Sequence, residues 1–279
     1  MKKTKVKVPA KINLTLDVLG KNDGYHTLES LVCSINLYDL ITVSKRKDYS
    51  TRLICKGLDV GCANTQNNAY IAAERFRKQF DLGGVDIVVK KNIPVGGGLG
   101  GSSADIAGVL KGCKKLFNLD CDLTEIANNL GSDSAYMLNG GYAVMQGRGD
   151  IVKPLNIKTK LYFLIVSMTE SVSARDCYSR FDSDGITYPK STSSAVEKLA
   201  NQDIKGFTSV IKNDLYKPAK EILPEIEENV KNLKAVYNGF MTGSGSATFA
   251  VFNSKKLRNK AYKILFPRYG KKLIKAQTV

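Results

Sequence analysis

The stretch that decides the fold reads Pro94-Val95-Gly96-Gly97-Gly98-Leu99-Gly100-Gly101-Ser102-Ser103-Ala104. Five glycines in six positions allow the backbone to approach a ligand closely with its N–H groups exposed. The Val- and Ile-rich residues 85–89 before this stretch predict a strand, and apolar residues three and four apart after it predict a helix over residues 102–117. A helix that begins at Ser102 adds its positive dipole end and hydroxyl donors. The stretch therefore predicts a phosphate-binding loop between a strand and a helix.

The same glycines leave a second function class open. Gly96, Gly98 and Gly101 satisfy G-x-G-x-x-G, and Asp120 follows at about the distance of the acid that binds a ribose in dinucleotide-binding proteins. That alternative is an oxidoreductase with a nicotinamide or flavin cofactor. Pro94 interrupts the join between strand and loop, and several predicted strands come earlier than such a unit would place them. The sequence contains no G-x-x-x-x-G-K-[ST] motif, which excludes an ordinary P-loop.

A second glycine loop reads Met241-Thr242-Gly243-Ser244-Gly245-Ser246-Ala247. Gly and Ser are common in tight turns, so this loop alone could be no more than a connection. Together with residues 94–104 it predicts a second segment of one binding site.

The chain of 279 residues, 43% of them hydrophobic, is long enough for two domains in close contact, with a boundary near Pro154. Residues 11–18 alternate apolar and polar, which predicts a half-buried strand whose polar face carries Lys11 and Asn13. Further strands are expected at residues 40–43, 52–55, 161–167 and 247–252, and further helices at 68–80, 193–199 and 225–236. Helical segments beside a few strands indicate the α+β class.

Composition narrows the setting and the partners. Six irregularly spaced cysteines and a single histidine argue against a zinc cluster or a disulfide framework and favour reduced cysteines in the cytoplasm. The longest apolar runs, such as residues 161–166, are far shorter than the roughly 20 residues of a membrane span, and no signal peptide is predicted. The net charge is +16, and eleven basic residues follow Glu228 with no further acid. Their spacing among apolar residues is typical of the solvated face of a helix.

Several separated parts of the chain resemble the GHMP kinase superfamily. Residues 94–104 are similar to its phosphate-binding motif, and residues 241–247 are similar to its third motif. Residues 9–14 and 23–28, with the mid-chain segment 130–150, resemble one branch of that superfamily. This branch phosphorylates the 2-hydroxyl of 4-diphosphocytidyl-2-C-methyl-D-erythritol in the non-mevalonate isoprenoid precursor pathway. Two departures stand out: the family has a further glycine before its serine pair, and it commonly has Val-Pro-Phe where this chain has Ser134-Ala135-Tyr136.

The resemblance implies a two-domain α+β fold with the active site in the cleft between domains. Residues 1–155 would form an N-terminal domain similar to the second domain of ribosomal protein S5, and residues 156–279 the C-terminal domain. ATP and Mg²⁺ are the implied cofactors, and the cytidine-diphosphate-linked methylerythritol is the implied substrate of a monomer or homodimer. No nucleic acid or membrane partner is expected. A kinase of the mevalonate or homoserine type, a non-catalytic sensor and a nucleic-acid-binding module with an S5-like half remain as alternatives.

The resemblance also assigns roles to residues of this chain. Asp133 would accept the substrate hydroxyl proton, and Lys11 would pair with it and stabilise the developing charge. Asn68 would lie near the adenine, and the loop 94–104 would hold the ATP phosphates. The implied substrate-binding residues are Asn13, Tyr25, His26, Tyr178, Thr242, Gly243 and Ser244.

Several of these roles have a plainer alternative. Asp133 could be a helix N-cap, because Asp is among the favoured residues there. Lys11 could be a solvated strand lysine, His26 a turn residue, and Tyr25 and Tyr178 core aromatics. The magnesium ligands are not identified by any acidic cluster in the sequence.

Overall fold

The computed structural model describes residues 2–22, 24–59, 61–185 and 188–279 and divides into two compact units. The first comprises Met1–Ala10, Leu37–Val95 and Gly100–Gly140, and the second comprises Lys11–Asn36, Gly96–Leu99 and Gly141–Val279. Each unit therefore contains several segments of the chain. None of the points at which the chain passes from one unit to the other falls at residue 155. The single boundary predicted there stays a prediction.

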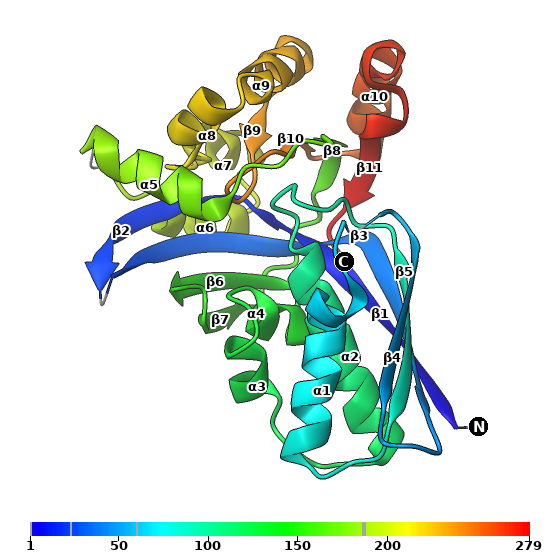
Figure 1. The fold of residues 1–279 in the computed structure, drawn as a ribbon. Coiled ribbons are helices and arrows are strands. Elements are labelled where there is room, and N and C mark those ends of the chain that lie inside the picture. The colour runs from blue at the N-terminus through cyan, green and yellow to red at the C-terminus, as the bar shows by residue number, and fades with distance from the viewer. Residues whose placement is uncertain (1, 23, 60, 186–187) are drawn as a thin grey trace. The chain divides into compact units, whose positions relative to one another are not determined.

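The first unit is built around a parallel β-α-β element. Its strands are β4 (Thr51–Gly57), β5 (Val85–Lys91) and the adjoining parts of β1 (Lys3–Asn13) and β3 (Tyr25–Lys45). Its helices are η1 (Asn64–Gln66), α1 (Asn68–Gln79), α2 (Gly101–Phe117), α3 (Thr124–Asn128) and α4 (Ser134–Asn139). Strand β4 is parallel to β5, and α1 makes the crossover that parallel strands require (Figure 1). The predicted helices over residues 68–80 and 102–117 are confirmed.

The pairing of β5 with its other neighbour removes the dinucleotide-binding alternative. Strand β3 runs antiparallel to β5, from Leu40 opposite Lys90 to Lys45 opposite Val85. The glycine loop therefore does not follow a strand of a doubly wound parallel sheet, which the G-x-G-x-x-G fingerprint needs.

Helix α2 packs closely on the strands because two of its residues have no side chain. A Cβ placed on Gly108 would lie 2.5 Å from Cγ1 of Ile41, and one on Gly112 would lie 2.7 Å from Cγ2 of Val43. Both contacts are shorter than carbon atoms tolerate, so the two glycines bring the helix axis close to the strands. Helix α2, at whose start the phosphate loop ends, is thereby packed directly on these strands.

The second unit contains a four-stranded sheet in the order β11-β8-β10-β9. It also contains β2 and β6, which pair with β3, and β7, which pairs with β6. Its strands are β2 (Asp17–Asn22), β6 (Tyr142–Gly147), β7 (Ile151–Leu155), β8 (Tyr162–Val166), β9 (Phe240–Met241), β10 (Thr248–Phe252) and β11 (Leu273–Gln277). Its helices are α5 (Ala174–Asp184), α6 (Thr192–Ala200), α7 (Ile204–Val210), α8 (Tyr216–Ile222), α9 (Glu225–Val236), α10 (Lys255–Tyr269) and η2 (Gly270–Lys272). The predicted strands at 161–167 and 247–252 and the helices at 193–199 and 225–236 are confirmed to within a few residues.

The four-stranded sheet has its own core. Leu164 and Phe252 from the strands pack with Leu233 of α9 and with Ala261 and Leu265 of α10. Ala261 and Leu265 are four residues apart and so lie on one helical face.

Strand β2 pairs with β3 in antiparallel register, and β6 joins the other edge of the same part of β3.

The prediction of one half-buried strand over residues 11–18 is wrong in two respects. All eight residues are buried, and β1 ends at Asn13 while β2 begins at Asp17. The polar side chains have internal partners instead of water: Asp17 accepts hydrogen bonds from the backbone of Ser191 and Thr192, and Thr15 Oγ1 lies 2.7 Å from Thr192 Oγ1. Alternation along one segment cannot reveal that a distant segment will cover its polar face.

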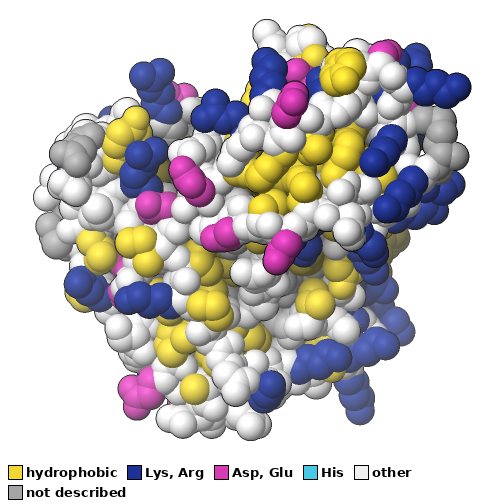
Figure 2. All heavy atoms as spheres, turned by 90° about the horizontal axis from the view of Figure 1, so that it is seen from below, with side chains coloured by type: hydrophobic (Ala, Val, Ile, Leu, Met, Phe, Trp, Pro, Cys, Tyr) yellow, Lys and Arg dark blue, Asp and Glu magenta, His cyan; other side chains and the backbone are white. Residues whose placement is uncertain are grey.

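Three expectations from composition can be compared with the structure: those on surface charge, on cysteines and on membrane-spanning helices. On the face drawn in Figure 2, Lys and Arg side chains are widespread and most dense along the right-hand edge, with acidic and apolar side chains among them. All six cysteines are free. Among the described residues, no helix has both the length and the apolar composition needed to cross a membrane.

Candidate active site

The two glycine loops predicted from the sequence contact each other within the second unit. The N–H of Ala247 donates to the carbonyl oxygen of Gly97 at 3.2 Å, and the N–H of Lys11 donates to the carbonyl oxygen of Leu99 at 3.0 Å. Gly98 has φ +72°, and a Cβ there would lie 2.4 Å from the carbonyl oxygen of Thr242. Only glycine combines that backbone conformation with that close approach. The central part of the phosphate loop is thus fixed against the second glycine loop.

Lys11 is held by a chain of buried polar groups that begins on β1. Its Nζ donates to Oδ1 of Asn13, and the side chain is only 4% exposed. The N–H of Asn13 donates to Oγ1 of Thr242 at 2.9 Å, and Nδ2 of Asn13 donates to Oγ of Ser30 at 2.7 Å. The sequence-based interpretation named Lys11, Asn13 and Thr242 but missed Ser30, which no local motif marks. A buried ammonium group directed by an amide is a candidate for stabilising developing negative charge.

The start of α2 has the features of an anion-binding helix terminus. Gly100 precedes the helix with φ +72° and, being glycine, has no side chain to cap the first turn. The N–H groups of that turn are orphan donors, and the helix dipole is positive there. Nδ2 of Asn68, the first residue of α1, donates to Oγ of Ser102. This bond joins the first residue of α1 to the first turn of α2, and the expected position of Asn68 near the adenine stays a prediction.

Asp133 directly precedes α4, but its side chain makes no capping hydrogen bond to that helix. The N–H of Ser134 donates instead to the carbonyl oxygen of Gly131 at 3.0 Å. A Cβ on Gly131 would lie 2.8 Å from Oγ of Ser134 and 3.4 Å from Oγ of Ser103, so the Asp133 turn packs beside the first turn of α2. The N-cap alternative thus lacks its defining bond. Asp133 belongs to the first unit and Lys11 to the second, and the pairing of their side chains stays a prediction.

A small pocket lies beside the single histidine in the second unit. It has a volume of about 140 Å³ and is lined by Val18, Leu19, Gly20, Lys21, His26, Phe181 and Asp182. Nε2 of His26 lies 2.7 Å from Oδ1 of Asp182, and Nζ of Lys21 lies 2.6 Å from Oδ2 of the same carboxylate. Burial raises the pKa of Asp182, but hydrogen bonds from Lys21 and His26 outweigh that effect and leave the pKa below its usual value. Asp182 is therefore an anion at neutral pH.

Tyr178 stacks directly on His26. Their ring centroids are 4.5 Å apart with planes inclined by 20°, and Phe181 meets the same imidazole edge-on at 6.3 Å. Both aromatic residues lie on α5, which the sequence analysis did not predict as a helix. Ser173 caps this helix by accepting from the N–H of Asp176.

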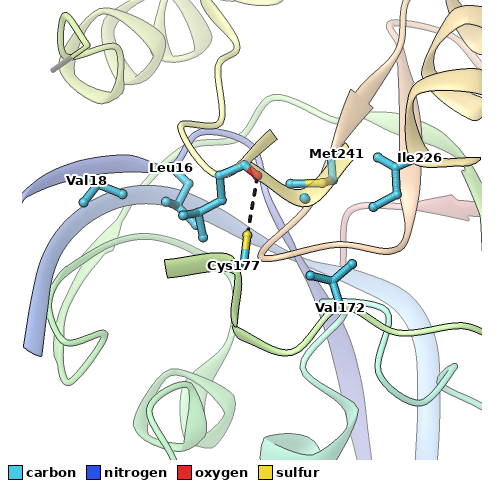
Figure 3. Close-up of a cluster of buried hydrophobic side chains, with 8 residues drawn as sticks. Leu16, Val18, Val172, Cys177, Ile226 and Met241 are labelled. Carbon is cyan, nitrogen blue, oxygen red and sulfur yellow. Dashed lines mark hydrogen bonds between the residues drawn. The ribbon is translucent and has the colours of Figure 1, made fainter. Parts of the chain in front are cut away.

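A buried hydrophobic cluster supports these aromatic side chains. Leu16, Val18, Val172, Cys177, Ile226 and Met241 lie around a common centre, with the Cys177 thiol donating to the carbonyl oxygen of Leu215 at 3.6 Å (Figure 3). Tyr178 and Phe181 pack against this cluster while remaining partly exposed. Tyr178 is thus neither a fully buried core residue nor a free surface residue. Its position suits a side chain that supports a ligand-binding wall.

Tyr25 does not join this group. It is 55% exposed, and the guanidinium carbon of Arg148 lies 3.9 Å from the centre of its ring. Neighbouring residues of a strand point to opposite faces, so Tyr25 and His26 diverge although they are adjacent in sequence. The role of Tyr25 at the substrate stays a prediction. Asp23, which belongs to the same sequence motif, lies outside the described residues.

Known families match both halves of the chain. The model of the GHMP kinases N-terminal domain matches residues 67–147, and the model of the GHMP kinases C-terminal region matches residues 195–272. The chain belongs to the GHMP kinase superfamily. It has that superfamily's two-domain α+β fold and is a small-molecule kinase of a class that uses ATP, typically with Mg²⁺.

Several relatives are similar over almost their whole length. The chain is 33% identical to a 4-diphosphocytidyl-2-C-methyl-D-erythritol kinase of Clostridium beijerinckii, covering 95% of this chain and 96% of that protein. It is 36% identical to the protein of the same name from Carboxydothermus hydrogenoformans, covering 95% and 94%. A crystal structure of 4-(cytidine 5'-diphospho)-2C-methyl-D-erythritol kinase has a TM-score of 0.82 at 29% identity over 98% of both chains. A mevalonate kinase of L. major, with a TM-score of 0.76 at 15% identity over 99% and 97%, shares the fold.

Proposed function

We propose that this chain transfers the γ-phosphoryl group of ATP to the 2-hydroxyl of 4-diphosphocytidyl-2-C-methyl-D-erythritol. The observation that carries the proposal is the stack of His26 on Tyr178 beside a pocket whose acid, Asp182, directs the imidazole. A flat base with a polar edge is recognised by an aromatic wall together with a few hydrogen-bonding groups. The similarity to relatives that carry this kinase's name points to the same substrate.

The hydrogen bond from His26 to Asp182 also suggests a preference among bases. In the neutral imidazole, a carboxylate beside Nε2 favours the tautomer with the proton on Nε2, which leaves Nδ1 as an acceptor. An acceptor suits the exocyclic amino group of cytosine and opposes the carbonyl oxygen that uracil has in its place. We therefore expect CDP to bind more tightly than UDP.

The proposed chemistry assigns separate roles to the glycine loop, Asp133 and Lys11. Phosphoryl transfer depends mainly on positioning and charge stabilisation. The N–H groups at Gly98 to Ser103 would hold the ATP phosphates, and Mg²⁺ would be bound chiefly by those phosphates. Asp133 would accept the proton of the attacking hydroxyl, and Lys11 would stabilise the charge that develops on the reacting oxygens. The bond between the γ-phosphorus and its bridging oxygen breaks as the new phosphate ester forms, and ADP leaves.

An ADP-release assay tests the proposal. The purified chain is offered ATP and Mg²⁺ with the diphosphocytidyl substrate, mevalonate, homoserine or galactose in separate reactions. ADP release only with the diphosphocytidyl substrate supports the proposal. Release with mevalonate or homoserine alone would assign the chain to another branch of the superfamily. Retained binding of an ATP analogue with no turnover on any of the four would favour a non-catalytic sensor.

A further inference from the structure

A buried cluster of three charged side chains lies beneath the start of α2 in the first unit. Lys91, the last residue of β5, is 3% exposed, Asp39 of β3 is 0% exposed, and Asp105 of α2 is 4% exposed. Nζ of Lys91 lies 2.5 Å from Oδ2 of Asp39 and 2.6 Å from Oδ2 of Asp105, and it donates to the carbonyl oxygen of Gly101 at 3.0 Å. These three bonds use every N–H donor of the ammonium group.

The hydrogen bonds of this cluster reach the chain segments on both sides of the phosphate loop. On the entry side, Oδ1 of Asp39 accepts from the N–H groups of Asn92 and Ile93, at 2.6 and 3.0 Å, in the turn that leads from β5 into the loop. On the exit side, Lys91 binds Gly101 and Asp105 in the first two turns of α2. One ammonium group therefore connects the two ends of the segment that the proposed function assigns to the ATP phosphates.

The packing at Gly101 shows how directly the helix start rests on this lysine. A Cβ on Gly101 would lie 3.2 Å from Nζ of Lys91 and 3.1 Å from Cγ2 of Ile93. Little space is left for the first turn of α2 to shift toward β5. If Lys91 moved, the first turn of α2 would lose the contact beneath Gly101 that holds it in place.

Stability alone does not account for such a cluster. Removing charges from water is costly, and well-packed apolar residues can replace buried ion pairs without loss of stability. Here two carboxylates share one cation, and Oδ1 of Asp105 has no hydrogen-bond partner among the described residues. Unlike apolar packing, charge-assisted hydrogen bonds are directional. The bonds of this cluster can therefore fix the positions of the backbone segments that they join.

We propose that Lys91 is a positioning residue for nucleotide binding, which holds the entry and exit of the glycine loop so that the N–H groups of the first turn of α2 face the ATP phosphates. This inference rests on the proposed ATP site at that loop. Lys91 would act through Gly101 and Asp105 and would not itself touch the nucleotide.

The test compares Lys91→Met with a matched variant of another buried cation in the same unit. Arg77 of α1 is 7% exposed and donates to Thr51, to Glu74 and to the carbonyl oxygens of Tyr49 and Leu82, so Arg77→Met also removes a buried cation and several hydrogen bonds. Because Lys91→Met leaves two buried carboxylates without a cation, it could fail to fold. Lys91→Met/Asp105→Asn keeps one carboxylate, Asp39, whose Oδ1 still accepts two backbone N–H groups.

Binding of the non-hydrolysable analogue AMP-PNP with Mg²⁺ is measured by calorimetry on folded protein, as verified by circular dichroism. We expect Lys91→Met, or the double variant in its place, to raise the Kd for AMP-PNP by about tenfold or more, since small displacements of positioning groups have large effects. Arg77→Met should keep the Kd within about twofold of the wild type at temperatures where it is folded. The affinity of each variant for CDP should be unchanged.

Three results would overturn the inference. The first is wild-type affinity for AMP-PNP in the folded double variant, and the second is an equal loss in Arg77→Met, which would reduce Lys91 to a general stabilising role. The third is a failure of the wild type to bind AMP-PNP. This result would also refute the proposed ATP site, whereas the first two would leave that site in place.

Discussion

Substituting Gly98 by alanine tests the contact between the two glycine loops. Gly98 has φ +72°, where a residue with a Cβ costs about 1–2 kcal/mol. The added Cβ would also lie 2.4 Å from the carbonyl oxygen of Thr242, whereas ordinary contacts begin at 3.4 Å. The loops must therefore separate by roughly 1 Å, and misplacement by that distance costs on the order of 10²-fold in rate.

The control is Gly141→Ala, because Gly141 has φ +81° and a Cβ there would meet nothing within 4 Å. Both variants carry the backbone strain, but only Gly98→Ala carries the clash. We expect Gly141→Ala to lose about 1–2 kcal/mol in urea unfolding and Gly98→Ala to lose at least that much, and only Gly98→Ala to lose about 10²-fold in turnover, measured as ADP release at saturating ATP. Turnover within about threefold of the wild type in folded Gly98→Ala, or an equal loss in Gly141→Ala, would refute the reasoning.

Four further predictions concern individual side chains. Asp133→Asn should retain AMP-PNP binding and lose turnover by ~10² or more, as expected for loss of a general base, and near-normal ADP release would make Asp133 structural. Tyr178→Ala should weaken CDP binding by ~1–3 kcal/mol in calorimetry while leaving AMP-PNP binding unchanged, and equal losses for both ligands would indicate general destabilisation. Asp182→Ala should narrow the preference for CDP over UDP, because the tautomer of His26 is no longer set by a carboxylate; an unchanged ratio in competition binding contradicts this. Burial raises the pKa of Asp105 from 3.8 to about 7, with Asp39 adding to the rise and Lys91 opposing it. Between these values the folded state binds more protons than the unfolded state, so this group makes stability fall as pH rises toward 7, by at most about 1.4 kcal/mol per pH unit, and Asp105→Asn should lose that slope in urea unfolding.

The sequence alone was sufficient for features that depend on neighbouring residues. The run of glycines before an apolar helical repeat predicted the loop at 94–104 and helix α2, because closely approaching backbone and 3.6-residue periodicity are local properties. Helices α1 and α9 and strands β8 and β10 followed from local apolar patterns in the same way. The resemblance of short motifs to the GHMP kinases likewise needed only the order of residues, and the family models agree with it.

Only the tertiary structure decided which polar side chains are buried and what they contact. Thr15 and Asp17 alternate with apolar residues as a solvated strand face would, yet Ser191 and Thr192, more than 170 positions later, cover them. The same holds for Asp182 at His26 and for Asp39 and Asp105 at Lys91. A buried polar group needs a hydrogen-bond partner, but that partner can come from any segment that folding brings near. Periodicity reports which face a residue occupies relative to its neighbours, and long-range packing determines what lies against that face.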